Sequence, residues 1–279
     1  MNPSPAPVAQ PVVQSVAENL PMGAPAPQPS FATSVSETTV RAAPVAPGPA
    51  IPMSPLHKQV FEKVKKGEID EVVRLVRENN LDMNQVRDEQ KNFYQSPMFA
   101  ATVLSDKEQA FKMMQMLVNL GLNPLNEDSL KQTPLFYACR DGFNQAIEWF
   151  CNERGDTVTR QDIYGQTPVY YAVRDGHIKT VQLLMDMGGN FDHVDQKNQR
   201  PIYYAIKANR FEMVKFLIDK GADLQTEDKK GMSPTMFAKK SNKNELVSLL
   251  LENGGAPIKE GKSNANNRRP KAPAAQQAA

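Results

Sequence analysis

The sequence predicts an all-α solenoid in which short helix–turn–helix units stack side by side, with a disordered segment at each end. Three observations favour this fold class. A motif with a central proline recurs through the middle of the chain at a nearly constant interval. Each of the last four copies is followed by apolar residues at positions i, i+3 and i+4, the spacing of one helix face. The other prolines gather at the start, where residues 1–55 hold 13 of the 22.

Residues 1–55 form the first segment, rich in Pro, Ala, Val, Ser and Gln. Proline lacks a backbone donor and blocks helix formation, and large apolar groups are too few here to offset the entropy of ordering. We expect a disordered arm with polyproline-II character. A flexible arm is the favoured interpretation, and docking of Pro25–Pro29 to a proline-binding module is the alternative.

The middle of the chain is self-similar. Its five motif copies are, in order, Ser96–Ala101, Thr133–Ala138, Thr167–Ala172, Arg200–Ala205 and Ser233–Ala238. Their prolines stand at 97, 134, 168, 201 and 234, which gives intervals of 37, 34, 33 and 33 residues. This pattern resembles the T-P-L-H-x-A signature and 33-residue period of the ankyrin repeat. The resemblance implies an ankyrin-repeat solenoid of six units joined by β-hairpin-like fingers.

Each unit can be explained residue by residue. Ser or Thr before the proline can cap the first helix, and proline fits the first helical position, where its missing N–H would have no partner. Gly or Asn, which tolerate a left-handed backbone, follow eight residues after the later prolines and predict a tight turn. They are Gly142, Gly176, Asn209 and Asn242.

The predicted repeat domain covers residues 56–258. Its units are 56–90, 91–127, 128–161, 162–194, 195–227 and 228–258. The second unit carries four extra residues around Ser105–Phe111, and the third carries one before Gly155. The first unit is inferred from the apolar spacing before and after Gly67. Ser54–His57 mimics the motif but lies too early to belong with Gly67, so it is expected to be a linker.

Aromatic residues occupy the place that is usually His in the resembled family: Phe99, Phe136, Tyr170 and Tyr203, each followed by a second aromatic or small residue. In that family the His helps to link neighbouring repeats by hydrogen bonds. Here stacking and burial would have to substitute for it. We favour an inter-repeat core because the positions recur in every unit; a hydrophobic binding groove is the competing interpretation.

The charges and motifs give no sign of catalysis. The net charge is +2, with a body (residues 56–258) near neutral and a basic tail at residues 259–279, which is also expected to be disordered. No catalytic constellation, phosphate loop or metal-ligand spacing is present, so we expect no enzyme activity, cofactor, metal or small-molecule substrate. His177 is expected to be structural and His193 solvated. Cys139 and Cys151 form no C-x-x-C pair and favour a reducing compartment.

The resemblance implies that a partner protein contacts the finger tips and the exposed residues of the first helices, which line the concave face. One position there is cationic in four successive units: Arg140, Arg174, Lys207 and Lys240. Stacked helices lie ~8–10 Å apart, so these side chains would form a basic row. Asp141 and Asp175 would neutralise part of it, and an ordinary solvated face is the competing interpretation.

Apolar residues are expected at several finger tips: Phe93, Leu130, Ile163 and Tyr164. Interface energy concentrates in a few such residues, so they are candidate anchors. The predicted surface is apolar towards its N-terminal units and basic towards its C-terminal ones. This polarity suits a peptide with an apolar end and an acidic end.

The sequence therefore predicts a non-enzymatic protein-interaction adaptor. Association with nucleic acid or chromatin through the basic groove and tail is one alternative, although it is disfavoured by the neutral body. A regulatory subunit of an enzyme on another chain is a second. No segment is long and apolar enough to span a membrane. We expect a cytoplasmic location, with the nucleus as an alternative because of Arg268–Lys271.

Overall fold

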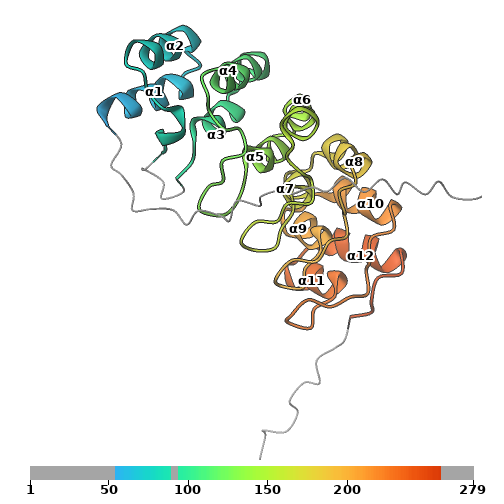
Figure 1. Cartoon of the computed structure of the whole chain (residues 1–279). Coiled ribbons are helices and arrows are strands. Elements are labelled where there is room, and N and C mark those ends of the chain that lie inside the picture. Colours follow the sequence, from blue (N-terminus) through green and yellow to red (C-terminus); the bar gives the residue numbers. More distant parts are fainter. Residues whose placement is uncertain (1–53, 89–93, 259–279) are drawn as a thin grey trace, which may run out of the picture. The chain divides into compact units, whose positions relative to one another are not determined.

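The computed structural model describes residues 54–88 and 94–258, all within one compact unit (Figure 1). This part of the chain is helical and contains no β-strand. In order, its elements are α1 (Pro55–Lys65), α2 (Ile69–Glu78), the 3₁₀ turn η1 (Met83–Gln85), α3 (Pro97–Thr102), α4 (Lys107–Asn119), α5 (Pro134–Arg140), α6 (Asn144–Glu148), the π-helix η2 (Trp149–Glu153), α7 (Pro168–Asp175), α8 (Ile178–Asp186), α9 (Pro201–Lys207), α10 (Phe211–Asp219), α11 (Pro234–Lys240) and α12 (Asn244–Glu252).

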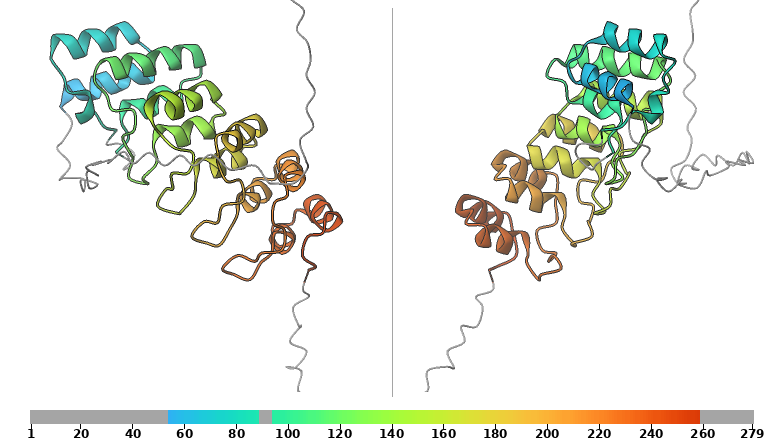
Figure 2. Two further views of the ribbon diagram at one scale, coloured as in Figure 1. Left: turned by 45° about the vertical axis from the view of Figure 1, so that its right-hand side comes forward. Right: turned by 90° about the vertical axis from the view of Figure 1, so that its left-hand side faces the viewer.

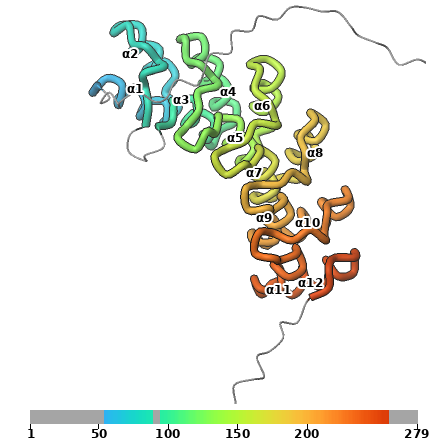
Figure 3. Tube along the Cα trace, turned by 60° about the horizontal axis from the view of Figure 1, so that its bottom comes forward, coloured from blue at the N-terminus to red at the C-terminus, as the bar shows by residue number. Residues whose placement is uncertain are grey.

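The helices pair within units, and the units stack in chain order. The first helices α1, α3, α5, α7, α9 and α11 each contact the next one along the stack. Figure 3 shows α5, α7, α9 and α11 along one side, with α6, α8, α10 and α12 along the other. Long loops, the fingers, extend from the stack away from the second helices (Figure 2). The predicted all-α solenoid of helix–turn–helix units is confirmed.

Proline begins every first helix, as the motif predicts, but the expected Ser/Thr caps form at only two of them. Ser54 Oγ accepts from the N–H of His57, and Ser233 Oγ accepts from the N–H of Met236. Thr133 does not cap its helix; its hydroxyl donates to Asp156 Oδ2 at 2.6 Å instead. The threonine therefore ties the helix start to a later loop of its own unit.

Ser54–His57 is the start of α1 and not a linker, which corrects the sequence interpretation. Helix α1 has 11 residues, whereas α5 has 7. One additional N-terminal turn explains why the motif lies so far ahead of Gly67. Val60, Phe61 and Val64 of this longer helix are buried.

The two insertions are absorbed by the second helices. Helix α4 has 13 residues and α8 has 9, a difference of four. The single extra residue of the third unit appears as the π-helix η2, in which each hydrogen bond spans one residue more than in an α-helix. Trp149 and Phe150 of this segment are buried. The extra residue thus widens one helical turn without shifting the next unit out of register.

The predicted turns are present, and the alanine of each motif copy is buried. The residues between the two helices of each later unit have positive φ, from 56° at Asn209 and Asn242 to 88° at Gly176. The motif alanines are fully buried: Ala101, Ala138, Ala172, Ala205 and Ala238. The predicted arm and tail, apart from Ser54 and Pro55, and the candidate anchor Phe93 lie outside the described residues.

Candidate functional site

Each described finger is held by a buried aspartate. Asp162 Oδ1 accepts from the backbone N–H groups of Tyr164 at 2.8 Å and Gln166 at 3.0 Å. The N–H of Asp162 in turn donates to the carbonyl of Gln166, which closes the finger. Asp128, Asp195 and Asp228 make the same contacts in their own fingers. This network fixes the backbone, so the second and third finger residues are presented outward.

A side-chain ladder joins each finger to the next unit. Gln132 Nε2 donates to the Tyr171 hydroxyl at 2.5 Å, and that hydroxyl donates to Asp162 Oδ2 at 2.6 Å. One unit later, Gln166 Nε2 donates to the Tyr204 hydroxyl, which donates to Asp195 Oδ2. We call these contacts the Gln–Tyr–Asp ladder; its four rungs are Gln95–Tyr137–Asp128, Gln132–Tyr171–Asp162, Gln166–Tyr204–Asp195 and Gln199–Asp228, the last without a tyrosine.

The ladder hydroxyls stay protonated. Burial, together with the neighbouring Asp128 carboxylate, raises the pKa of Tyr137 to about 12. Burial and the bonded aspartate raise the pKa of Tyr171 and of Tyr204 further. Sequence reasoning did not find this ladder, although the D-x₃-Q-x₄-Y spacing was visible in three units.

The aromatic residues in the usual His position form core, as favoured. Phe99, Phe136, Tyr170 and Tyr203 are buried, and each meets an aromatic ring of the following unit edge-on, with centroids 5.0–5.5 Å apart. The Tyr170 hydroxyl lies 2.6 Å from the His193 carbonyl oxygen and 2.9 Å from that of Gln199. The Tyr203 hydroxyl makes the equivalent contacts. Hydrogen bonds therefore link neighbouring units at both tyrosines, where only stacking and burial were expected.

His177 and His193 both make structural contacts. His177 Nε2 donates to the carbonyl of Arg140 at 2.8 Å, as expected for a structural residue. His193 was expected to be solvated, but it is half-buried and its Nε2 donates to the carbonyl of Gly165 at 3.0 Å. It links two fingers, which corrects that expectation.

The predicted basic row is not uniform. The Arg140 guanidinium lies over the Tyr137 ring at 4.4 Å and pairs with Asp141 at 3.3 Å. Arg174 repeats the arrangement over Tyr171, with Asp175 at 2.9 Å. Both guanidinium groups are thus half-buried and already have a carboxylate beside them. Their net contribution to a binding field is correspondingly small.

Lys207 and Lys240 differ from the two arginines. Both are exposed at the ends of α9 and α11, and among the described residues neither forms a salt bridge. The free positive charge of the row therefore lies at its C-terminal end. Asp141 and Asp175 neutralise the other two positions of the row, and binding of a partner by the row stays a prediction.

The finger tips change character along the stack. Ile163 and Tyr164 are 38% and 44% exposed, and Leu130 is half-buried. Tyr94, at the second finger, is also exposed and was not singled out from the sequence. The corresponding tip residues of the last two fingers are polar or basic: Gln196 and Lys197, then Lys229 and Lys230.

Backbone hydrogen bonds connect successive tips. The N–H of Ile163 donates to the carbonyl of Leu130, and the N–H of Gln196 donates to that of Tyr164. Lys229 donates in the same way to Lys197. All three N···O distances are 3.0 Å. The third to sixth fingers therefore form one continuous row of connected tips.

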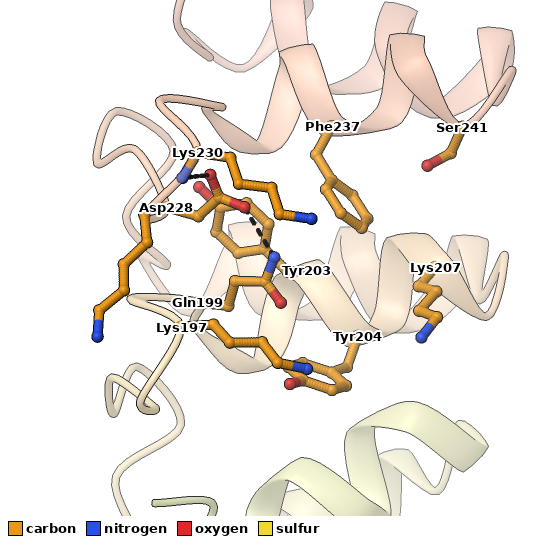
Figure 4. A pocket seen from close by; sticks show the side chains of 10 residues that line it. Lys197, Gln199, Tyr203, Tyr204, Lys207, Asp228, Lys230, Phe237 and Ser241 are labelled. Carbon is orange, nitrogen blue, oxygen red and sulfur yellow. Dashed lines mark hydrogen bonds between the residues drawn. The ribbon is translucent and has the colours of Figure 1, made fainter. Parts of the chain in front are cut away.

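Two hollows lie between the fingers and the first helices, one towards each end of the stack. The N-terminal hollow, about 410 Å³, is lined by Phe61, Lys65, Asp88, Gln95, Phe99, Ala100, Val103, Leu104, Tyr137 and Arg140. The C-terminal hollow, about 420 Å³, is lined by Lys197, Gln199, Tyr203, Tyr204, Lys207, Asp228, Lys229, Lys230, Phe237 and Ser241 (Figure 4). Six of ten residues in the first are apolar or aromatic, and four of ten in the second are lysine.

Two further features were sought in the described part of the chain. No cluster of three His, Cys, Asp or Glu side chains there could hold a metal ion. None of the helices formed by residues 54–88 and 94–258 has the length and apolarity needed to cross a membrane.

Comparison with known proteins gives a consistent result. A family model described as ankyrin repeats (3 copies) matches residues 97–195, 146–228 and 186–260. The structure is similar to the crystal structure of an ankyrin repeat domain from Acinetobacter baumannii AYE, with a TM-score of 0.53 and 22% sequence identity. That similarity covers 71% of this chain and 98% of the other. No curated protein sequence matches this chain.

Proposed function

Because the family model spans more than half of its length, the chain belongs to the ankyrin repeat family, and on this premise we propose that it is a non-enzymatic adaptor that holds a partner protein. Ankyrin repeats are in general protein–protein interaction modules. The proposed contact surface, here called the finger face, comprises the finger tips, the two hollows and the exposed ends of the first helices.

The change in chemistry along this face carries the proposal. Towards the N-terminal end the tips Leu130, Ile163 and Tyr164 are apolar, and six of the ten residues that line the hollow there are apolar or aromatic, whereas four of the ten that line the C-terminal hollow are lysine. Exposed apolar groups beside polar ones are typical of interaction sites. The surface suits an extended or helical segment that has an apolar end and an acidic end.

The rigidity of the fingers supports the same proposal. Each finger is closed by its own aspartate and bonded to the next tip, as at Asp162, Leu130 and Ile163. Ordering a loop during association costs free energy, and a surface that is already ordered avoids that cost. The candidate contacts are Leu130, Ile163, Tyr164, Lys207 and Lys240, with Arg140–Asp141 and Arg174–Asp175 between them.

The test is affinity capture of partners from native cells with the full chain as bait, followed by quantitative mass spectrometry. One variant places charge at the apolar tips (Ile163→Glu with Tyr164→Glu). A second reverses the free charge (Lys207→Glu with Lys240→Glu). We expect both variants to lose the same main partner.

A matched control carries the same kind of change on the second helices, at exposed Lys179 of α8 and Lys215 of α10. The control (Lys179→Glu with Lys215→Glu) should keep the partner. Equal capture by all variants, or loss in the control alone, would refute a partner site on the finger face.

A further inference from the structure

The C-terminal hollow has an unusual lining for a protein surface. It opens between α9, α11 and the last two fingers, and its base is made of the aromatic rings of Tyr203, Tyr204 and Phe237 (Figure 4). Its volume of about 420 Å³ lies within the roughly 300–1,000 Å³ that is typical of ligand pockets. The space is sufficient for one or two side chains of a bound segment.

Three ammonium groups surround these rings. Figure 4 shows Lys197 beside the Tyr204 ring, Lys207 further along the same helix, and Lys230 reaching towards Phe237. Within the described ranges no carboxylate lies at salt-bridge distance from any of the three. Four lysines and one aspartate line the hollow, and this excess of positive charge close to aromatic rings favours an anionic ligand.

One carboxylate, that of Asp228, is also among the residues that line the hollow. Asp228 is buried, and it accepts from the N–H groups of Lys230 and Met232 and from Gln199 Nε2 at 2.8 Å. These three hydrogen bonds hold the finger, and none of them comes from a lysine ammonium group. The backbone N–H of Lys230 donates to Asp228, whereas the Lys230 ammonium group extends towards Phe237 (Figure 4).

The aromatic hydroxyls are occupied too. The Tyr203 hydroxyl lies 2.7 Å from the Thr226 carbonyl oxygen and 2.8 Å from that of Met232, and the Tyr204 hydroxyl donates to Asp195. Phe237 has no hydroxyl. The rings can therefore offer apolar contact, while the hydrogen bonds available to a ligand come from the lysines.

We propose that this hollow receives an acidic side chain and an adjacent apolar side chain from an extended segment of the partner protein. The apolar group packs on the rings of Tyr204 and Phe237, and the anion lies among Lys197, Lys207 and Lys230. The anion is a carboxylate or a phosphate group, since both are negatively charged and accept hydrogen bonds from lysine. The inference rests on the proposed function and adds to it the class of segment that is bound.

The charge of the chain's own ends argues for a segment in trans. Residues 259–279 carry five cations and one anion, which the lysines repel. Residues 1–53 contain just two acidic residues, Glu18 and Glu37, which are 19 positions apart. Neither end offers the acidic cluster that three neighbouring ammonium groups would attract.

The probe is a displayed library of random 16-residue peptides, selected on the full chain. We expect the selected peptides to be enriched in Asp or Glu next to Phe, Leu, Ile or Trp. Each exposed ion pair changes affinity by up to about fivefold. Replacing Lys197, Lys207 and Lys230 together by Ala should therefore weaken the selected peptides by roughly 3- to 100-fold.

The matched control replaces Lys112, Lys179 and Lys215, three exposed lysines of the second helices, by Ala. This variant should bind the peptides like the parent chain. Both variants should unfold at the parent's temperature, followed by circular dichroism, since all six side chains are on the surface or at its edge. Synthetic peptides with phosphoserine at the acidic positions then tell the two anions apart: tighter binding assigns phosphate, and equal or weaker binding assigns carboxylate.

Three results would overturn the inference in different ways. Selected peptides without acidic enrichment, or peptides that bind the triple variant equally well, would leave the adaptor function in place but exclude this hollow as an anion site. A 20-nucleotide single-stranded DNA or RNA that binds more tightly than any selected peptide, and depends on the three lysines, would assign the hollow to nucleic acid. Failure of the parent chain to select any peptide would count against the adaptor function itself.

Discussion

Replacing Tyr171 by Phe should destabilise the repeat domain by about 2 kcal/mol, within the roughly 1.5–3 kcal/mol found for hydrogen bonds to charged groups. The Asp162 carboxylate accepts four hydrogen bonds: from the N–H groups of Tyr164 and Gln166, from the Tyr171 hydroxyl at 2.6 Å, and from Gln132 Nε2 at 3.1 Å. The substitution removes the shortest of the four and leaves Asp162 buried, so water cannot easily replace it.

The assay is unfolding in urea and on heating, followed by circular dichroism. For a domain of this size, about 2 kcal/mol corresponds to a decrease in Tm of roughly 4–8 °C. Since repeat stacks can lose two-state behaviour, amide hydrogen exchange at the third and fourth fingers should accompany the melting curves. A loss of less than about 0.5 kcal/mol, the lower bound for a typical net hydrogen bond, would refute the reasoning.

The chain offers the reciprocal experiment. Phe237 stands where Tyr137, Tyr171 and Tyr204 stand in earlier units, and Asp228 Oδ2 accepts only from Gln199 Nε2 among the described residues. Phe237→Tyr should complete the fourth rung of the ladder and stabilise the last unit by about 0.5–1.5 kcal/mol. No gain in the same unfolding assay would mean that the hydroxyl fails to reach Asp228.

Three more outcomes are expected. The ladder tyrosines have raised pKa values in the folded protein, about 12 for Tyr137, so the unfolded chain loses these protons at lower pH. The free energy of unfolding should therefore be retained below about pH 10 and fall as the pH rises above it. A rise in tyrosinate absorbance at 295 nm well before unfolding would contradict this. Burial raises the pKa of Cys139 and raises that of Cys151 to about 11, so Ellman's reagent at pH 8 should find two slow thiols in the native protein and two fast ones in urea. Gly176→Ala should cost about 1–2 kcal/mol, because Gly176 has φ of +88° and the added Cβ would lie 3.2 Å from Arg210 Cδ; an unchanged urea midpoint would refute it.

The fold could be predicted because its signals are local. Proline at the first helical position, and Gly or Asn at the turn as in Asn209, report backbone conformations that depend on few neighbours. The error at Ser54–His57 came from assuming a constant helix length. The additional turn is residues 55–58, none of which is buried, and it begins where Ser54 caps the helix and Pro55 takes the first helical position.

The site was harder to predict because its properties depend on pairs of units. The cationic row at Arg140 and Arg174 looks continuous in sequence, yet each guanidinium turns to the neighbouring aspartate and an aromatic ring. The ladder was missed for a related reason. Gln132 contacts Tyr171, a residue of the following unit, so inspection of one unit at a time shows no partner for it.

The same ladder determines how such a chain can be lengthened. A tandem copy of residues 162–194, inserted after the original, would bring both a donor amide and an acceptor tyrosine to each new junction. Beyond the last unit the situation differs, because Met232 stands where Gln95, Gln132, Gln166 and Gln199 stand and has no amide to donate. A duplicated unit can therefore join the ladder between existing units, whereas a unit placed after the sixth would receive no side-chain amide from Met232.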